Sequence, residues 1–278
     1  MSLLFDLNRR SVMAIINVTP DSFYAGSRAA DAESVESAVR RAVADGASII
    51  DIGGYSSRPG AEEVTAEEEF RRVAAGILAA RRAAPAVAVS VDTFRADVAA
   101  RCLEAFGPIM VNDITAGEAD PELMRIAARY DVPYVAMHMR GTPATMQSMT
   151  DYSDVVTEVA EYLRERIARL TEAGVRREKI VVDPGFGFAK TTEQNFQLLA
   201  GLHRLRELNT PILAGVSRKS MIYKTLNTTP AEALNGTTAL HWECLRQGAT
   251  ILRVHDVREA VQTVRLYEKF EKYYDTGR

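Results

Sequence analysis

The sequence predicts a closed (β/α)8 TIM barrel, in which eight parallel strands form a ring surrounded by helices. Eight short runs rich in β-branched residues alternate with eight longer stretches of helical periodicity along the 278 residues. The short runs are apolar on both faces, as strands are when helices cover a parallel sheet. A polar residue ends almost every run, which predicts a ring of polar side chains at one mouth of the barrel.

The elements follow one another without a repeat or a low-complexity tract. The predicted helices have apolar positions three and four residues apart, as in Val156, Val159, Leu163, Ile167 and Leu170. The predicted strands span 12–17, 48–52, 87–92, 109–113, 133–138, 179–183, 211–217 and 249–255. The predicted helices span 32–45, 66–83, 95–105, 121–130, 152–173, 193–208, 230–247 and 257–273.

The alternative architecture is a doubly wound open sheet. Such a sheet binds its ligand at one topological switch point, but here polar residues end the strands throughout, and no GxGxxG motif follows the first run. We therefore expect one barrel domain over residues 1–278. Three connections, 18–30, 53–65 and 139–151, are long or rich in Gly, Pro and Ser, and we expect the first two to be mobile loops over the barrel mouth.

The composition excludes several classes of protein. Lys and Arg number 34 against 37 Asp and Glu, so the net charge of −3 gives no overall attraction for nucleic acid or an anionic membrane. Cys102 and Cys244 have no metal-ligand spacing, which predicts reduced cysteines inside the fold. No apolar run approaches the roughly 20 residues that span a bilayer, and we expect a cytoplasmic protein.

The clearest sign of a binding site is the sequence Arg253-Val254-His255 at the end of the last strand. Residues two apart in a strand point to the same side, so we expect the guanidinium and the imidazole to form part of an anion site. The residues that end the other seven strands are Asn17, Asp51, Asp92, Asn112, His138, Asp183 and Ser217.

The strand-end carboxylates each have a second interpretation. Asp183 precedes the turn sequence PGFGF and could accept two parallel N–H bonds from a planar heterocycle, or it could cap a helix. Asp92 also reads as a helix cap, and Asp51, followed by Ile-Gly-Gly, is the weakest candidate of the three. At the fourth strand end only one of Asn112 and Asp113 can face the mouth; turn formation is the alternative for both.

Other polar residues suggest anion binding. Lys219 and Ser220 open a helix, where an ammonium, a hydroxyl and backbone N–H groups suit a carboxylate or phosphate, unless they form a solvated cap. Asn17 could bind a Mg²⁺ ion that already carries diphosphate. Ser57 and Arg58 in the second long loop suit anion capture, although turn chemistry alone would also explain them.

Two classes of chemistry find no support in the motifs. His203 and His241 fall in helical stretches, where surface or packing roles are expected, and no HExxH motif suggests zinc. No Ser-His-Asp order or GxSxG motif indicates a covalent nucleophile.

Nine short motifs together resemble the dihydropteroate synthase family of pterin-binding barrels. They occur in the family's order and extend over nearly the whole chain. They are INVTPDSF at 16–23, DIGG at 51–54, SRPGA at 57–61, SVDT at 90–93, VNDI at 111–114, MHM at 137–139, DPGFGF at 183–188, GVSRKS at 215–220 and RVH at 253–255.

The resemblance implies a homodimer that joins 6-hydroxymethyl-7,8-dihydropterin diphosphate to 4-aminobenzoate in folate biosynthesis and that sulfonamides inhibit. It implies catalytic roles for Arg253, His255, Lys219 and Asp92. The implied pterin ligands are Asp92, Asn112, Asp183 and Lys219. The implied diphosphate and Mg²⁺ ligands are Asn17, Arg253, His255 and Ser57. The implied aminobenzoate pocket contains Phe23, Arg58, Pro59 and Ser220.

The expected reaction begins with departure of diphosphate, followed by attack of the amine on a pterin-methyl cation, and it needs no strong general base. The chain departs from the usual family pattern at Ala25, where a loop carboxylate is missing, and at Tyr55 and Ser57, which replace Glu and Thr. Two other hypotheses remain at this point. One is a methyltetrahydrofolate-dependent methyltransferase, and the other is a binding module without catalytic activity.

Overall fold

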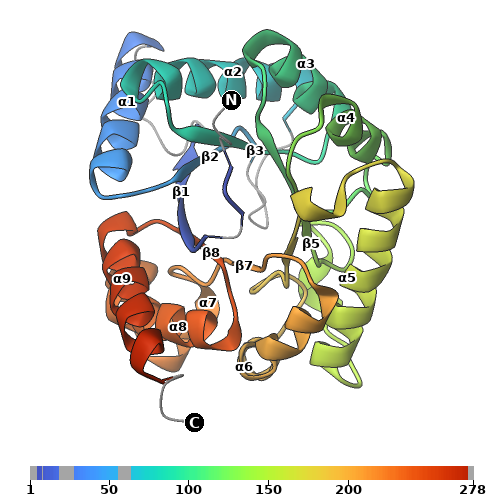
Figure 1. Ribbon diagram of the computed structural model, residues 1–278, viewed down its shortest axis with the longest axis vertical. Coiled ribbons are helices and arrows are strands. Elements are labelled where there is room, and N and C mark those ends of the chain that lie inside the picture. Colours follow the sequence, from blue (N-terminus) through green and yellow to red (C-terminus); the bar gives the residue numbers. More distant parts are fainter. Residues whose placement is uncertain (1–4, 8, 19–27, 56–63, 275–278) are drawn as a thin grey trace.

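The computed structural model describes residues 5–7, 9–18, 28–55 and 64–274. Within these ranges, eight parallel strands form one sheet in the order β6-β5-β4-β3-β2-β1-β8-β7. A bridge between Val182 and Ile212 joins the two ends of this order, so the sheet closes on itself. Figure 1 shows the resulting ring of strands with the helices outside it. The predicted barrel is confirmed, and the open-sheet alternative is wrong.

Each strand falls within the run predicted for it, except that β2 extends one residue further and β1 begins one residue earlier. The strands are β1 Ser11–Asn17, β2 Ile49–Gly53, β3 Ala88–Asp92, β4 Met110–Asp113, β5 Tyr134–Met137, β6 Ile180–Asp183, β7 Leu213–Ala214 and β8 Ile251–Val254.

The described helices lie between the strands and after β8 (Figure 1). They are α1 Arg28–Ala44, α2 Ala66–Ala83, α3 Ala96–Phe106, α4 Glu122–Tyr130, α5 Val155–Glu172, α6 Thr192–Ala200, α7 Ser220–Thr225, α8 Leu234–Gln247 and α9 Val257–Tyr274. Short 3-10 helices span Met146–Ser148, Arg177–Lys179, Leu202–Leu208 and Pro230–Glu232.

The sixth predicted helix, 193–208, is wrong in its second half. The α-helix ends at Ala200, and the chain continues as a 3-10 helix after Gly201. A Cβ on Gly201 would lie 2.7 Å from Val156 Cγ2, so close packing against α5 excludes a larger residue where α6 ends. The predicted strand 211–217 shortens to Leu213–Ala214. The helix expected to open at Lys219 and Ser220 is present as α7, although its six residues show too little periodicity to have been given a range.

Two layers of apolar side chains explain where the polar residues lie. One layer fills the barrel interior and includes Met13, Ile49, Met110, Val181 and Ile251. The other layer packs the outer faces of the strands against the helices. Since side chains alternate along a strand, residues two positions after the interior layer face the same side, at the carboxyl ends of the strands. This register places the polar residues of β2, β4, β6 and β8 at one mouth.

Both cysteines, Cys102 and Cys244, are free and buried, as predicted. Within the described ranges, no helix combines the length and the apolar character needed to cross a membrane.

Candidate active site

The guanidinium of Arg253 links two carboxylates across the barrel mouth. Its Nε donates to Asp51 Oδ2 at 2.7 Å, and its Nη2 donates to Asp92 Oδ2 at 2.7 Å. The amide of Asn112 donates to the same Asp51 oxygen at 3.1 Å. Asp51 is fully buried, and Arg253 is one-fifth exposed. Four strands, β2, β3, β4 and β8, therefore supply one connected network whose partners fix one another's orientation.

For each of two groups in this network, Asp92 and Arg253, burial and the attraction of the opposite charge act on the pKa in opposite directions. Burial raises the pKa of Asp92 to about 7, against the lowering effect of the Arg253 guanidinium, and the nearby Asp51 carboxylate adds to the rise. Burial alone would lower the pKa of Arg253, but Asp51 and Asp92 hold it above its ordinary value. The arginine therefore keeps its positive charge beside both carboxylates.

A second cluster lies at the carboxyl ends of β6 and β7. Asp183 is buried, and its Oδ1 accepts the Gly185 N–H at 2.7 Å. Lys219 donates to the Phe186 carbonyl, and its Nζ lies 4.6 Å from the centre of the Phe188 ring. Burial raises the pKa of Asp183, and the positive charge of Lys219 opposes this rise. Burial also lowers the pKa of Lys219 to about 8, with Asp183 acting in the opposite direction.

His255 follows β8 and turns toward the end of β7. Its Nδ1 lies 3.0 Å from Ser217 Oγ, and its backbone N–H donates to the same oxygen at 3.1 Å. The imidazole is exposed, yet partial burial and the adjacent Arg253 charge lower its pKa. A neutral imidazole at an exposed edge of the mouth can donate a hydrogen bond to an anion without a prior change of charge.

An ion pair fixes the turn that presents Lys219 and Ser220. Arg218 has the left-handed φ of 55°, and its Nε and Nη2 donate to the two oxygens of Asp256 at 2.8 and 2.7 Å. Asp256 directly follows His255, so this bidentate pair joins the β7–α7 turn to the end of β8. Lys219 is the N-cap residue of α7, and Ser220 is the first residue of that helix.

Some predicted residues lie beside these clusters. If Gly53 carried a Cβ, that atom would lie 3.4 Å from Asn17 Oδ1 and 3.8 Å from Asp92 Oδ2, so the Asn17 amide oxygen and the Asp92 carboxylate both border Gly53. Tyr55 packs edge-on against Phe94, with ring centres 5.2 Å apart, and Arg95 lies over its ring at 5.5 Å. Phe23, Ala25, Ser57, Arg58 and Pro59 lie outside the described residues.

Two strand-end residues have structural partners instead of facing the mouth. Asp113 accepts hydrogen bonds from Tyr134 Oη at 2.5 Å and from the backbone of Gly117 at 2.6 Å, on the outer side of the barrel. His138 is buried, and its Nδ1 contacts Lys190 Nζ at 2.9 Å. Of the neighbouring pair Asn112 and Asp113, it is therefore Asn112 that faces the mouth.

The helical histidines have packing and surface positions. His241 is buried in α8, whereas the exposed His203 lies 2.8 Å from Gln247 Oε1. The buried His241 and the exposed His203 thus have the packing and surface roles expected for them.

Asp51 was the weakest of the predicted carboxylates, and Lys190 was not among the predicted site residues. The Gly-Gly pair after Asp51 suggested a turn, but the alternation along β2 places Asp51 two residues beyond the interior residue Ile49. That register was available from the sequence. Lys190 contacts mainly backbone oxygens, which leave no pattern in a sequence.

Asn17 is the predicted ligand for Mg²⁺. No cluster of three or more His, Cys, Asp or Glu side chains suited to a metal occurs among the residues described. The Asn17 oxygen and the neighbouring Asp92 carboxylate nevertheless offer hard oxygen donors on either side of the small residue Gly53. Because Mg²⁺ keeps several waters and needs few protein ligands, this donor set fits a Mg²⁺ ion that is bound mainly by diphosphate.

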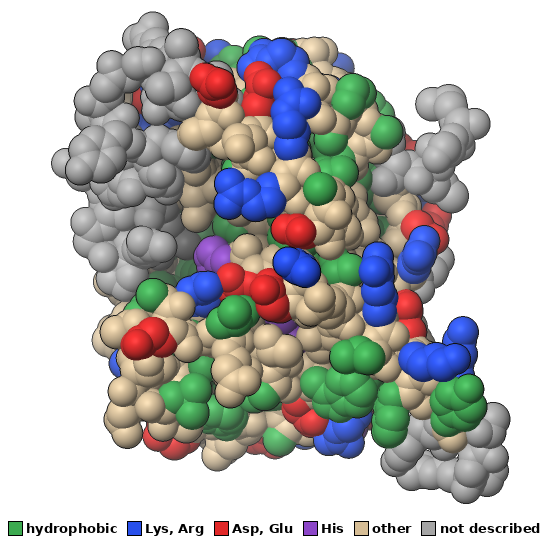
Figure 2. Space-filling model, turned by 90° about the vertical axis from the view of Figure 1, so that its left-hand side faces the viewer, with side chains coloured by type: hydrophobic (Ala, Val, Ile, Leu, Met, Phe, Trp, Pro, Cys, Tyr) green, Lys and Arg blue, Asp and Glu red, His purple; other side chains and the backbone are tan. Residues whose placement is uncertain are grey.

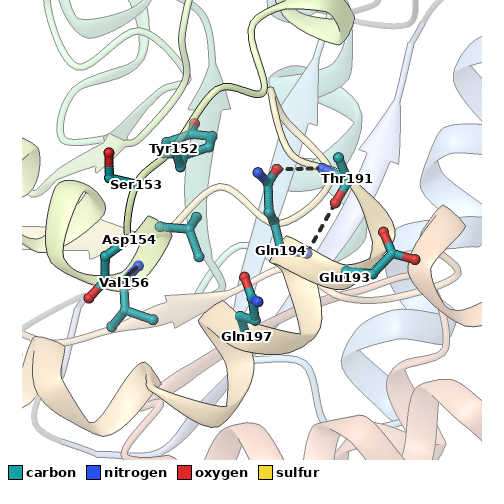
Figure 3. A pocket seen from close by; sticks show the side chains of 9 residues that line it. Tyr152, Ser153, Asp154, Val156, Thr191, Glu193, Gln194 and Gln197 are labelled. Carbon is teal, nitrogen blue, oxygen red and sulfur yellow. Dashed lines mark hydrogen bonds between the residues drawn. The ribbon is translucent and has the colours of Figure 1, made fainter.

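A separate groove of about 600 Å³ lies between the start of α5 and the start of α6 (Figure 3). Asp154 caps α5 there, and Thr191 and Gln194 form the capping box of α6 whose two hydrogen bonds Figure 3 draws. None of the mouth residues described above lines this groove. It is therefore distinct from the candidate active site.

A closed parallel barrel whose strand ends converge on one charged mouth is the arrangement of barrel enzymes, which carry their active sites at that face. The family model described as "Pterin binding enzyme" matches residues 13–255. The chain is 44% identical to the dihydropteroate synthase of Synechocystis over 93% of this chain and 90% of the relative. It is 43% identical to that of Escherichia coli, over 95% of this chain and 92% of the relative.

Solved structures agree with these sequence relatives. The Xanthomonas albilineans dihydropteroate synthase with 4-aminobenzoic acid matches with a TM-score of 0.87 and 40% identity, covering 96% of this chain and 95% of that one. The Yersinia pestis enzyme in a sulfonamide drug complex matches with a TM-score of 0.89 and 38% identity, covering 96% of each chain. The chain therefore belongs to the pterin-binding enzyme family and, within it, to the dihydropteroate synthases, which are transferases.

Proposed function

We propose that this chain condenses 6-hydroxymethyl-7,8-dihydropterin diphosphate with 4-aminobenzoate to give 7,8-dihydropteroate and diphosphate. The names of the relatives support the reaction. Solved complexes of relatives with 4-aminobenzoic acid and with 7,8-dihydropteroate support one substrate and the product. The sulfonamide complex of a relative supports inhibition by sulfonamides. In this chain, the single geometric observation that carries the proposal is the Arg253 guanidinium held between Asp51 and Asp92.

Arg253 and His255 are proposed to stabilise the departing diphosphate. Two guanidinium nitrogens of Arg253 are held by carboxylates, while Nη1 makes no hydrogen bond to the described residues. A charge that is fixed in place before the reaction stabilises a developing anion without reorganisation. The neutral imidazole of His255, beside Ser217, adds a donor at the same edge of the mouth. Ser57 is proposed to add a hydroxyl from the second loop, on the resemblance alone.

Asp183, Asn112, Asp92 and Lys219 are proposed to bind the pterin. The amino-pyrimidinone edge of a pterin presents adjacent N–H donors, and Oδ2 of the buried Asp183 carboxylate, the oxygen that does not accept the Gly185 N–H, is a matching acceptor. Asn112 donates to Asp51 through its NH₂ group, which leaves its carbonyl oxygen for a second pterin donor. Lys219 is proposed to donate to pterin acceptors from the opposite side of the mouth.

The proposed order of events is diphosphate departure, then amine attack. The carboxylates of Asp92 and Asp183 are proposed to stabilise a pterin-methyl cation, and the neutral aniline nitrogen needs no strong base to attack such a cation. Phe23, Arg58, Pro59 and Ser220 are proposed, on the family resemblance, to shape the aminobenzoate pocket. Exclusion of water during this interval would protect the cation from hydrolysis.

Mg²⁺ is the proposed cofactor, with the Asn17 amide oxygen as its protein ligand. When bound, the ion would neutralise part of the diphosphate charge. Asn17 ends β1, the strand next to β8, which carries Arg253, so the metal ligand and the diphosphate ligand come from neighbouring strands. The residues proposed for the anion thus belong to one wall of the mouth.

We also propose a cytoplasmic homodimer in which residues 1–278 of each chain form one domain. The side chains of Leu266, Phe270 and Tyr273 on α9 are 65%, 46% and 67% exposed, which is unusual for three large apolar residues on one helix. Figure 2 shows the face of the molecule on which α9 lies. Hydrophobic side chains gather on the lower part of that face, and basic and acidic side chains are interspersed across it. An apolar helix face of this kind suits a second copy of the chain.

The proposed function is tested by product formation from the purified chain. We expect 7,8-dihydropteroate and diphosphate to appear in equal amounts when the pterin diphosphate, 4-aminobenzoate and Mg²⁺ are supplied together. Omitting 4-aminobenzoate, or supplying a pterin without diphosphate, should abolish dihydropteroate formation. Absence of dihydropteroate from the complete mixture would contradict the proposal.

A further inference from the structure

Lys190 is a buried amino group that none of the proposed chemical steps uses. It is 5% exposed, and its Nζ has three partners: His138 Nδ1 at 2.9 Å, the Gly185 carbonyl at 3.0 Å and the Phe188 carbonyl at 2.9 Å. These three partners match the three N–H donors of the ammonium form, whose charge is opposed by burial, which lowers the pKa of Lys190 well below its ordinary value. Lys190 therefore holds the protein's own turn instead of reaching toward a ligand.

The turn that Lys190 holds, residues 184–188, runs unusually close to β5. Gly185 has a φ of +68°, and a Cβ at this position would lie 2.0 Å from the His138 carbonyl oxygen. Gly187 has a φ of +81°, and its N–H donates to the buried Asn195 Oδ1 at 2.6 Å. Backbone in this conformation needs contacts that hold it, because glycine has the greatest freedom to leave it.

The opposite side of the same turn contacts the active site. The Gly185 N–H donates to Asp183, the Phe186 carbonyl accepts from Lys219, and the Phe188 ring lies below the Lys219 ammonium. Lys190 binds the carbonyls of the first and last of these three residues. A displacement of the turn would therefore move the hydrogen-bond partners of both Asp183 and Lys219.

His138 completes the cluster as an acceptor. Burial, and next the positive charge of Lys190, lower the pKa of His138 to about 2, so its ring stays neutral. The ring also packs edge-on against Tyr162, with centres 4.9 Å apart, which fixes its orientation. The backbone N–H of His138 donates to the Asp183 backbone carbonyl at 2.9 Å, so the same residue contacts both the lysine and the main chain of the residue that bears the site carboxylate.

We propose that Lys190, supported by His138, is a positioning residue for the pterin subsite. It acts through the 184–188 turn, which sets the placement of Asp183 and Lys219. This proposal rests on the proposed function, since it assumes that Asp183 and Lys219 bind a pterin. If it holds, substitution of Lys190 must weaken pterin binding more than it changes the KM for 4-aminobenzoate.

The test compares Lys190→Met with Lys224→Met, a substitution of an exposed lysine on α7. Dissociation constants for a bare 6-hydroxymethylpterin are measured by calorimetry, alongside the KM for 4-aminobenzoate and the melting temperature. We expect Lys190→Met to weaken pterin binding by about tenfold or more, because two buried carbonyls and an imidazole lose their donor. The KM for 4-aminobenzoate should change by less than about threefold, and Lys224→Met should change neither value.

A second pair of variants keeps the test decisive if Lys190→Met does not fold. His138→Gln retains an acceptor for Lys190, whereas His138→Leu removes it, and pterin affinity should fall only in the leucine variant. Unchanged pterin affinity in a folded Lys190→Met variant, or in His138→Leu if the former is unfolded, would overturn the positioning role. Failure of the wild-type chain to bind any pterin would instead contradict the proposed function.

Discussion

The two sides of the barrel mouth hold their charged groups by different means. On the side formed by β2, β3, β4 and β8, side chains far apart in sequence bind one another: Arg253 contacts Asp51 and Asp92 across 202 and 161 residues. On the side of β6 and β7, Asp183 and Lys219 are held mainly by backbone atoms of one short turn. The first side depends on closure of the whole barrel, and the second depends on local geometry.

This difference has consequences for mutation and for pH. Partners in a buried ionic network orient one another, so loss of one member should disturb the others. A residue held by backbone atoms should respond to changes in its turn and remain insensitive to the distant network. Substitutions on the two sides should therefore differ in the size of their effects and also in how strongly they couple to substitutions at neighbouring residues.

The largest effect is expected for Arg253→Ala. Removing the guanidinium leaves Asp51 and Asp92 without their shared cation, and kcat/KM for the diphosphate substrate should fall by roughly 100-fold to 1,000-fold. Binding of a bare pterin should fall by a smaller factor, because it lacks the diphosphate. Steady-state kinetics and calorimetry measure the two quantities, with the surface variant Arg164→Ala as the control. Equal losses in both would show that Arg253 serves the barrel alone.

Asp183→Asn should have the next largest effect. The amide replaces one acceptor oxygen by an NH₂ donor, which would face the N–H donors of the pterin. We expect this to cost about 2 to 4 kcal/mol in substrate binding. Calorimetric titration with bare pterin measures this loss, and Asp97→Asn on the surface of α3 serves as the matched control. Near-normal pterin affinity in Asp183→Asn would remove Asp183 from the pterin site.

Double-mutant cycles test the difference between the sides directly. Asp51→Asn combined with Arg253→Lys should show a coupling of about 1 kcal/mol or more in unfolding free energy, since the two side chains are in contact. Asp51→Asn combined with Lys190→Met should be additive within about 0.5 kcal/mol, because the two residues share no partner. Urea unfolding measures all five variants. Equal coupling in both cycles would mean that the mouth behaves as one network.

The smallest effects should be opposite slopes of stability with pH. Asp92 binds its proton more tightly when folded, with a pKa of about 7 against the ordinary 3.8, so its contribution to stability falls as the pH rises through this interval. Lys219 binds its proton less tightly when folded, with a pKa of about 8 against 10.5, so its contribution rises as the pH increases through that interval.

Unfolding free energies measured across both intervals, for the wild type, Asp92→Asn and Lys219→Met, separate these contributions. Each substitution should remove one slope and leave the other. A Lys219→Met variant that keeps the wild-type rise between pH 8 and 10.5 would contradict the burial assigned to this lysine.

Much of the fold could be predicted from the sequence because a parallel barrel repeats one simple pattern. Eight apolar runs separated by amphipathic helices leave few other arrangements, and strand ends located Asp92, Asn112, Asp183 and Arg253 at one mouth. The end of α6 at Gly201 was missed although glycine commonly ends a helix, whereas the close contact with Val156 of α5 at this position is remote in sequence and left no signal.

The partners of the site residues were harder to predict than their positions. Arg253 was expected to face an anion, and the structure adds that two carboxylates already hold it. Tyr55 looked like a loss of the usual Glu, yet its ring lies beside Phe94 and under the guanidinium of Arg95, so an aromatic contact with a cation is present at this position. Such pairings require knowledge of which strands and turns become neighbours.

In the proposed reaction, this mouth stabilises a departing diphosphate before the amine attacks. Single-turnover rates of diphosphate release, measured with a series of ring-substituted 4-aminobenzoates at saturating concentration, test it most directly. We predict that the release rate stays nearly constant as the basicity of the amine changes. A release rate that rises steadily with amine basicity would show that the amine takes part in the rate-limiting displacement and would contradict this account.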